Sequence, residues 1–363
     1  MRLAILIHDY TAMGGTERVT LQLCNQLAKH HTITLISVQQ TGKEPAFILS
    51  DNVQVKFLSD DAANMLRTLP QKVYVLRKIL GEIKPNAVIA SDSQMALLSL
   101  PATIGKRYQK IVWEHFNSQI ETRFGSRWFA RRLAARFAHT IVVLTQQDKR
   151  EWEKKYHCKA SVVVHANPCA LPLPLLNPYR DAHVVLSAGR YTEQKGFDLL
   201  VKAWKCLSSE MRQGWVLRIV GPNGSAKTEL LAAAKDDESI RIEGPSSNMK
   251  KCYLDAGIFV CSSRYEGFGL TIVEAMTHGV PVIAFDCPMG PAEIIKEEYG
   301  KVVELANISA LSRELASMIE SKSNRQYYSE RSFERASHFT PEITIGRWES
   351  LLEVCADKEI KIP

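Results

Sequence analysis

The 363-residue sequence lacks the short motifs that mark several common kinds of site. Its eight cysteines are scattered, and no two have the C-x-x-C spacing of a zinc or redox centre. The histidines and cysteines do not have the spacing of metal ligands, and no D-x-D pair follows a predicted strand. We therefore predict no metal site, and we expect reduced thiols, most of them buried.

Long apolar runs are also missing, and the longest fall far short of the roughly 20 residues that cross a bilayer. The opening stretch, "MRLAILIHDY", is too short for the apolar core of a secretory signal and reaches His8 and Asp9 at once. With 45% hydrophobic and 23% charged residues, the composition is typical of a soluble globular protein. At roughly 100–200 residues per domain, the length favours two domains. The sequence therefore predicts a cytoplasmic protein.

Positive charge is unevenly distributed along the chain. Residues 1–170 hold 23 basic and 13 acidic residues, a net charge of +10, whereas the rest hold 23 and 26. A basic half is typical of proteins that bind nucleic acid, anionic lipid or a phosphorylated substrate. No stretch has the interleaved basic and aromatic residues of a known nucleic-acid module. We therefore predict no nucleic-acid partner and rank a non-enzymatic nucleic-acid binder lowest.

Apolar strands alternate with amphipathic helices in both halves, which is typical of parallel α/β sheets. Several prolines interrupt this rhythm, and we place a linker near 167–182 because proline breaks both helices and central strands. The predicted fold class is α/β, with two Rossmann-like, doubly wound domains over 1–170 and 171–340. Residues 341–363 are expected to form a C-terminal helix, for which packing back toward the first domain is one option. In such folds, ligands bind at the carboxyl ends of strands, and a cleft between the halves is the expected site.

A glycine pair, Gly14–Gly15, follows the first predicted strand and precedes a helix. Adjacent glycines let the backbone approach a ligand, and a helix N-terminus offers free N–H groups to an anion. The segment has neither G-x-G-x-x-G nor the Walker pattern, which argues against a dinucleotide site. Taken alone, the pair fits a tight turn as well as it fits a phosphate contact.

Two cations, Arg190 and Lys195, flank the loop "GRYTEQKG" between a predicted strand and a helix. Two fixed positive charges beside a helix N-terminus suit a diphosphate. The alternative is a solvated loop, since most exposed lysines and arginines bind nothing specific.

Two carboxylates, Glu266 and Glu274, flank a glycine-rich turn after another predicted strand, and a helix is expected to begin near Leu270. A carboxylate accepts paired hydrogen bonds from vicinal hydroxyls, so the two groups could hold two sets of hydroxyls on one extended ligand. Helix-start electrostatics for Glu274 and acid–base chemistry for the pair remain open alternatives.

His115 ends the apolar strand "KIVWEH", where a structural role and a ligand contact are both open. The following segment, "SRWFARRLAARFA", predicts a helix with Phe129, Leu133 and Phe137 in one line. Either this stripe packs in a core while the arginines are solvated, or the helix lies on an anionic membrane. The arginines concerned are Arg127, Arg131, Arg132 and Arg136.

Together these segments resemble the retaining family-4 glycosyltransferases. The stretch "EGFGLTIVEAMTHGVPVIAFD" resembles the family's E-x7-E region, and "GRYTEQKG" resembles its G-R-x-x-x-x-K-G loop. "GGTERV" is similar to its N-terminal glycine loop, and "WEHFN" to its first-domain histidine segment. "DCPMGPAEII" is similar to the segment after E-x7-E in many polysaccharide-building members. The matches cover nearly the whole chain, in the family's order.

The resemblance implies the GT-B fold, in which two Rossmann-like domains face a central cleft. The donor nucleotide-sugar would bind the second domain and the acceptor the first. The resemblance implies Arg190 and Lys195 on the donor diphosphate, Glu274 on the ribose hydroxyls, and Glu266 and His115 beside the transferred sugar. Further substrate contacts are implied for Gly14, Gly15, Gly244, Pro245, Gly267, Phe268, Gly269 and Leu270.

The predicted function is that of a metal-independent hexosyltransferase without a cofactor. It would move a sugar, from UDP-hexose or UDP-N-acetylhexosamine, to a lipid-linked or surface-glycan acceptor in polysaccharide, O-antigen or lipopolysaccharide synthesis. A diphosphate-lipid acceptor, or a membrane contact through the four arginines, would put the enzyme at the inner face of the cytoplasmic membrane. The alternatives are a sugar-nucleotide epimerase, which needs no acceptor, and a phosphorylase, which needs phosphate and usually a pyridoxal-bearing lysine.

Overall fold

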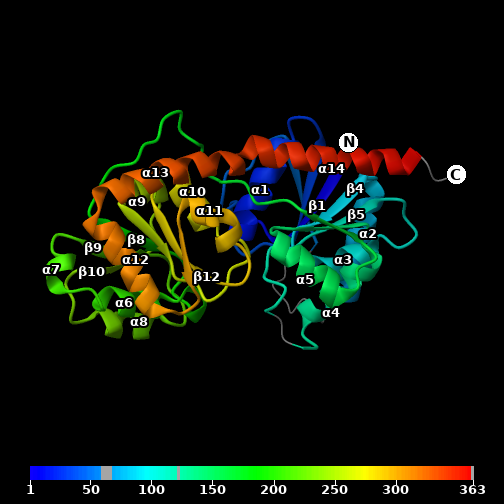
Figure 1. Cartoon of the computed structure of the whole chain (residues 1–363). Coiled ribbons are helices and arrows are strands. Elements are labelled where there is room, and N and C mark those ends of the chain that lie inside the picture. Colours follow the sequence, from blue (N-terminus) through cyan, green and yellow to red (C-terminus); the bar gives the residue numbers. More distant parts are fainter. Residues whose placement is uncertain (59–67, 121–122, 361–363) are drawn as a thin grey trace. The chain divides into compact units, whose positions relative to one another are not determined.

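The computed structural model describes residues 1–58, 68–120 and 123–360 (Figure 1). The chain divides into two units. Unit 1 consists of residues 1–170 and the C-terminal helix that begins at Pro341, and unit 2 consists of residues 171–340. Each unit is built around its own parallel β-sheet.

Within the described part of unit 1, seven parallel strands lie in the order β3-β2-β1-β4-β5-β6-β7. Successive residues of β1 alternate between the two faces of the sheet, and Leu3 to Ile7 are all buried, so helices cover both faces. Helices α2 to α5 pack on one face, and α1 packs against α14. The elements are β1 (Arg2–Asp9), α1 (Gly15–Leu27), β2 (Thr32–Gln39), β3 (Val53–Phe57), α2 (Leu69–Ile83), β4 (Ala87–Ala90), η1 (Ser93–Met95), α3 (Ala96–Ala102), β5 (Gln109–Trp113), α4 (Ser126–Phe137), β6 (Thr140–Val143), α5 (Gln146–Tyr156), β7 (Ser161–Val164) and α14 (Pro341–Ile360).

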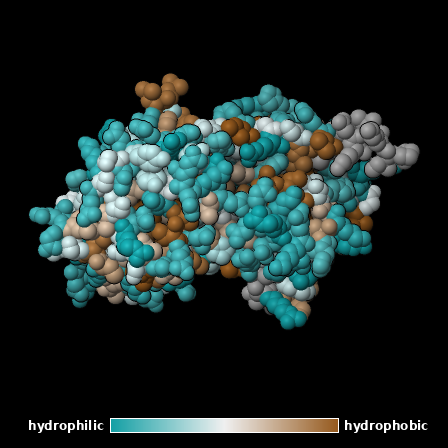
Figure 2. All heavy atoms as spheres, in the orientation of Figure 1, coloured by the Kyte–Doolittle hydropathy of each residue, from teal (hydrophilic) through white to brown (hydrophobic). Residues whose placement is uncertain are grey.

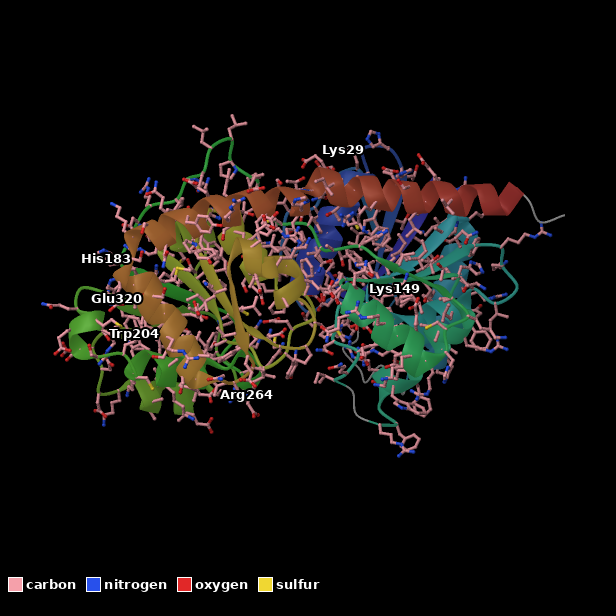
Figure 3. All side chains as sticks on the ribbon, viewed as in Figure 1. Lys29, Lys149, His183, Trp204, Arg264 and Glu320 are labelled. Atoms are coloured by element: carbon pink, nitrogen blue, oxygen red, sulfur yellow. The ribbon has the colours of Figure 1, made fainter. Side chains whose placement is uncertain are left out.

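Unit 2 has six parallel strands among its described residues, in the order β10-β9-β8-β11-β12-β13. Helices α6, α8 and α12 lie on one face of this sheet, and α10, α11 and α13 lie on the other (Figure 1). Trp204 of α6, labelled in Figure 3, is fully buried, and its indole N–H donates to Ser239 Oγ at 2.9 Å. The elements are β8 (Val184–Ala188), η2 (Glu193–Lys195), α6 (Phe197–Lys205), α7 (Ser209–Arg212), β9 (Val216–Val220), α8 (Lys227–Ala234), β10 (Ile240–Glu243), α9 (Met249–Leu254), β11 (Ile258–Cys261), α10 (Leu270–Thr277), β12 (Val282–Asp286), α11 (Pro291–Tyr299), β13 (Lys301–Glu304), α12 (Ile308–Glu320), α13 (Lys322–Ala336) and η3 (Ser337–Phe339).

Strand order decides which loops can meet. In unit 2 the order reverses between β8 and β11, so the loop after β8 lies beside the loop after β11 at the carboxyl edge of the sheet. These two loops carry Arg190 with Lys195, and Glu266. In unit 1 the reversal lies between β1 and β4, and β5, which precedes His115, is the next strand. The α/β, doubly wound fold class predicted from the sequence is confirmed.

The proline-rich segment between the sheets forms neither helix nor strand. In unit 2 it exposes Leu175 and Leu176 almost completely. Figure 2 shows this part of the surface as an apolar projection at the upper left, over the green loop of Figure 1. In unit 1, Trp348 of α14 is buried with its ring 5.0 Å from that of Trp113, so the C-terminal helix belongs to the core of that unit.

Of the two arrangements left open for α4, the one in which its phenylalanines pack in a core is wrong. Phe129 and Phe137 are 51% and 55% exposed, and the helix buries Ala130, Ala134 and Ala135 together with Arg131. The physical reason is that alanines allow α4 to approach its neighbours closely, while Arg131 is neutralised by a buried carboxylate. Phe129 and Phe137 therefore lie on the outer face of this helix, whereas Leu133 is partly buried against the core. Among the described helices, none is both long and apolar enough to span a bilayer.

Candidate active site

The loops after β8 and β11 are joined by an ion pair between two predicted site residues. Lys195 Nζ lies 2.6 Å from Glu266 Oε1, with 19% and 7% of the two side chains exposed. Burial alone would lower the pKa of Lys195, but the adjacent Glu266 carboxylate raises it above its usual value. Lys195 is therefore charged at neutral pH, and the ion pair is only partly enclosed.

Hydrogen bonds between the two loops fix the position of Lys195. Ser262 Oγ donates to the Lys195 carbonyl at 2.9 Å, and Gln194 Nε2 donates to the Tyr265 carbonyl at 3.1 Å. Gly196 adopts a left-handed φ of +61°, and a Cβ there would lie 2.0 Å from the Ser262 carbonyl oxygen. Gly196, the last residue of "GRYTEQKG", is thus required by the close approach of the two loops.

Arg264, labelled in Figure 3, secures the same junction from the other side. Its guanidinium makes two hydrogen bonds of 2.8 Å to the Asp198 carboxylate at the start of α6 and a third, of 2.7 Å, to the Glu193 carbonyl. Sequence reasoning missed this residue, because the bidentate pair joins segments 66 positions apart.

Arg190 is the cation that remains unpaired in this region. It directly follows the Gly189 turn after β8, it is exposed, and its guanidinium has no partner within the described residues. An exposed arginine beside a paired lysine leaves positive charge available to an anion at this edge of the sheet.

The turn that carries Glu266 is shaped by glycine. Ser263 Oγ donates to Glu266 Oε1 at 2.6 Å, and Gly269 has a φ of +110° just before α10 begins at Leu270, where the sequence predicts it. Gly267 is half-buried, whereas the Phe268 side chain is buried in contact with Phe339.

Glu274 lies in the second turn of α10, so the interpretation as a helix-start charge is wrong. The residue is 4% exposed, and its Oε2 accepts a hydrogen bond of 2.7 Å from the Tyr253 hydroxyl. The Tyr253 ring stacks on His278, whose Nδ1 donates to the Glu274 carbonyl at 2.8 Å. Tyr253 and His278 were not predicted from the sequence.

At the end of β10, Gly244 and Pro245 are exposed. A Cβ at Gly244 would meet nothing within 4 Å, so the space above this backbone is open. The adjacent Glu243 carbonyl accepts a hydrogen bond from the Tyr191 hydroxyl, which ties the end of β10 to the loop after β8.

In unit 1, the glycine pair caps α1 at its N-terminus. Gly14 is the N-cap and Gly15 is the first helical residue. The preceding loop is held by Asp9, whose carboxylate accepts hydrogen bonds from the backbone and hydroxyl of both Thr11 and Thr41. Burial raises the pKa of Asp9, but these four bonds outweigh it and hold the pKa below its usual value.

His115 lies at the carboxyl end of β5 and is 8% exposed. Its ring is 4.2 Å from the Trp113 ring, and its Nε2 has no hydrogen-bond partner among the described residues. Burial lowers the pKa of His115 to about 3. A neutral imidazole with a free nitrogen can accept or donate one hydrogen bond to a polar group that reaches it.

A buried ionic network lies behind His115. Arg131 Nε is 2.7 Å from Glu114 Oε2, and both side chains are fully buried. Arg127 is 3.6 Å from the other oxygen of Glu114 and 3.2 Å from Asp92. The prediction that Arg131 reaches a membrane surface is therefore wrong, and Arg127 is mostly enclosed by its two carboxylate partners.

The structure thus joins Lys195 to Glu266 through adjacent loops of unit 2, with Arg190 on the same loop as Lys195 and Glu274 on the helix after Glu266. His115, Gly14 and Gly15 lie at strand and helix ends of unit 1. Among the described residues, no group of three His, Cys, Asp or Glu side chains is placed to hold a metal ion.

Comparison with known proteins links both units to one class of enzyme. Residues 13–169 match the family model described as Glycosyltransferase Family 4, and residues 176–335 match that described as Glycosyl transferases group 1. The chain is 30% identical over 370 residues to the amylovoran biosynthesis glycosyltransferase AmsD of Erwinia amylovora, covering 97% of this chain and 99% of that protein.

A second relative is named for a defined reaction. It is the GalNAc-alpha-(1->4)-GalNAc-alpha-(1->3)-diNAcBac-PP-undecaprenol alpha-1,4-N-acetyl-D-galactosaminyltransferase of Campylobacter jejuni, 24% identical over 363 residues, covering 97% of this chain and 98% of that protein. Among solved structures, Anabaena HepE in complex with UDP and glucose matches with a TM-score of 0.79 at 15% identity, covering 98% of this chain and 100% of that one. This likeness shows the GT-B fold.

Proposed function

The chain belongs to the family-4 glycosyltransferases, and on that premise we propose that it transfers a hexose or N-acetylhexosamine from a UDP-sugar to a lipid-linked or surface-glycan acceptor. The relative in Erwinia is named for amylovoran biosynthesis, and the relative in Campylobacter is named for an undecaprenol-linked acceptor. Both names support a role in bacterial polysaccharide or O-antigen synthesis, and the UDP in HepE supports the choice of donor.

The observation that carries the proposal is the Lys195–Glu266 pair next to the unpaired Arg190. In the proposed donor complex, Arg190 and Lys195 bind the diphosphate, Glu274 accepts hydrogen bonds from the ribose hydroxyls, and Glu266 faces the transferred sugar. The exposed backbone at Gly244 and Pro245 receives the base, and the backbone of Gly267 to Leu270 faces the sugar.

Lys195 has two roles in this account. Without donor it is paired with Glu266, and when the diphosphate arrives it moves its charge toward the phosphate oxygens. The glycosyl–phosphate bond breaks with both electrons passing to the diphosphate, while the acceptor oxygen bonds the anomeric carbon and gives its proton to the leaving oxygen. Fixed cations aimed at the developing negative charge are typically the largest contribution to such catalysis. In this proposal, neither donor binding nor sugar transfer uses a metal ion.

In unit 1, we propose that His115 hydrogen-bonds a sugar hydroxyl of a substrate through its neutral imidazole and that the Gly14–Gly15 backbone at the start of α1 binds phosphate oxygens. We attribute retention of the anomeric configuration to the family; the α linkage in the name of the Campylobacter relative is consistent with it, because UDP-hexoses are α-linked donors.

Calorimetric titration with UDP and GDP, with and without magnesium, tests the donor site. We expect wild type to bind UDP equally well in both conditions and Arg190→Ala to lose most of that affinity. Arg331→Ala is the matched control, because Arg331 is a partly exposed arginine of α13 in the same unit whose partners are surface glutamates and the Tyr327 ring. Binding that requires magnesium, or that survives Arg190→Ala, would contradict the proposed site.

We also propose that the outer face of α4 contacts anionic lipids on the inner side of the cytoplasmic membrane. Phe129, Arg132, Arg136 and Phe137 are exposed on this face. The Arg132 guanidinium lies 3.7 Å from the Trp128 ring centroid, so aromatic and cationic groups alternate there as in interfacial helices.

Co-sedimentation with phosphatidylglycerol vesicles tests this contact. Arg132→Glu combined with Arg136→Glu should release the protein, whereas Lys29→Glu combined with Lys106→Glu makes the same change in net charge at exposed sites elsewhere in unit 1. Equal release by both double variants would mean that only net charge matters, and no release by the first would exclude the α4 contact.

A further inference from the structure

We propose that Arg131 is a positioning residue that fixes the backbone of residues 114–118 and thereby orients His115. The inference rests on the proposed function, since it assumes that His115 contacts a sugar hydroxyl of a substrate. It assigns a role to a helix residue that contacts no substrate.

The contacts of Arg131 converge on the loop after β5. Its Nε bonds the Glu114 carboxylate at 2.7 Å. Its Nη2 donates to the carbonyls of Phe116 and Asn117, both at 3.1 Å, and its Nη1 donates to the Ser118 carbonyl at 3.3 Å. One rigid, planar guanidinium therefore holds a carboxylate and three successive carbonyls, which is a geometry that a lysine ammonium cannot reproduce.

Glu114 closes the same loop from inside. Its Oε1 accepts hydrogen bonds from the backbone N–H groups of His115, at 3.1 Å, and Phe116, at 3.0 Å. Burial alone would raise the pKa of Glu114, but Arg131 and Arg127 lower it below its usual value, so the carboxylate stays ionised. The backbone N–H of His115 thus donates to a carboxylate whose charge Arg131 neutralises.

The loop has a second anchor on α5. Asp148 Oδ1 accepts hydrogen bonds from the Ser118 backbone N–H and hydroxyl, and Lys155 Nζ donates to the Ser118 carbonyl at 3.0 Å. The far end of the segment therefore has anchors on α5 in addition to its bond from Arg131. Removal of Arg131 is expected to release the part near His115 while leaving the end at Ser118 attached.

Stability alone is a weak reason for such an arrangement. A buried ion pair often gives no more stability than apolar residues of the same volume, because desolvation offsets the attraction. Apolar side chains would fill the same space, but they would remove the donor to Glu114 Oε2 and one donor from each of three carbonyls. The arginine is thus suited to imposing one backbone conformation next to a site residue.

The test compares Arg131→Lys and Arg131→Met with Arg325→Met. Arg325 is also buried, and it pairs with Asp181 and two helix carbonyls of unit 2, so its loss costs stability without touching the 114–118 segment. The measurements are UDP release from UDP-glucose, UDP-galactose and their N-acetyl forms, UDP affinity, and amide hydrogen exchange of residues 115–118.

We expect both Arg131 variants to lower kcat at least tenfold and to speed exchange at 115–118, while UDP affinity stays within twofold of wild type. Arg131→Lys keeps the charge opposite Glu114 and should remain folded. It therefore allows the test to be made even if Arg131→Met fails to fold. On a His115→Ala background, a change at Arg131 should lower kcat no further. Arg325→Met should lower thermal stability with kcat unchanged.

The proposal is overturned if the Arg131 variants keep wild-type kcat while His115→Ala lowers it, or if they act equally on the His115→Ala background. It is also overturned if exchange at 115–118 is unchanged. If His115→Ala has wild-type kcat, the proposed role of His115 fails instead, and faster exchange in the Arg131 variants would then identify a purely structural contact.

Discussion

Each unit places a glutamate near the carboxyl end of a central strand and forms a close ion pair there, yet the two pairs differ in their access to solvent. In unit 1, Glu114 and Arg131 are 2.7 Å apart and both are 0% exposed. In unit 2, Glu266 and Lys195 are 2.6 Å apart, with 7% and 19% exposed. The Arg131 guanidinium donates hydrogen bonds to a carboxylate and three carbonyls of one loop. Lys195 is a single ammonium on the same loop as the unpaired Arg190.

This difference separates two uses of the same chemistry. A fully buried pair cannot change partners without exposing a charge to an apolar interior, so it can only hold structure in place. A partly open pair can exchange one partner for an arriving anion at little cost. We therefore assign the pair of unit 1 to positioning and the pair of unit 2 to donor binding.

The strongest way to break the comparison is to remove one carboxylate charge from each pair. Glu114→Gln leaves Arg131 charged and buried, and we expect it to lower the free energy of unfolding by about 3–5 kcal/mol. Glu266→Gln leaves Lys195 partly solvated, and we expect a loss below about 1 kcal/mol. Urea unfolding followed by tryptophan fluorescence measures both, and equal losses would mean that the pairs do not differ as proposed.

Removal of the open cation should affect catalysis instead of folding. Lys195→Ala takes away a donor aimed at developing negative charge, and we expect kcat for UDP release to fall about 10²–10³-fold. Lys202→Ala, at an exposed position on α6, is the matched control. A decrease of less than tenfold in Lys195→Ala would argue against a role at the diphosphate.

A smaller effect is expected at the second carboxylate of unit 2. Tyr253→Phe removes the hydroxyl that holds Glu274 Oε2, a hydrogen bond to a charged group worth about 1.5–3 kcal/mol in typical cases. We expect UDP affinity to fall about tenfold. Tyr179→Phe is the control. It removes a tyrosine hydroxyl that donates to the Gly257 carbonyl, and it should leave UDP affinity unchanged.

The last expected effect is a pH dependence that belongs to unit 1. Burial lowers the pKa of His115 from 6.5 to about 3. Between these two pH values, His115 is therefore protonated in the unfolded chain and neutral in the folded chain. The stability that the neutral ring contributes is complete above pH 6.5, and it is lost progressively as the pH falls from 6.5 to about 3. We expect His115→Gln to flatten the slope of unfolding free energy by about 1.4 kcal/mol per pH unit between pH 6 and 4. An unchanged slope would contradict this shift.

Much of this architecture could be predicted from the sequence because it depends on local patterns. Strands buried on both faces appear as apolar runs, as in "RLAILIH", and the start of α10 is marked by the glycine turn before Leu270. Short edge strands such as β7 and β13 were missed, since four residues carry little periodicity.

The pairings could not be predicted, because they depend on contacts between distant residues. Glu266 and Lys195 are 71 positions apart, and only the order of β8 and β11 brings their loops together. Arg131 was assigned to the surface from its helical spacing. That spacing does not reveal that Glu114, 17 positions earlier, supplies a buried countercharge.

The central claim is that Glu266 and the donor diphosphate compete for Lys195, and titration of Glu266→Gln with UDP in the presence of EDTA tests it most directly. Without the glutamate charge, Lys195 is free before UDP arrives, so the account predicts UDP binding at least twofold tighter than in wild type. The same variant should lose sugar transfer. Unchanged or weaker UDP binding would contradict the exchange of Lys195 between the two anions.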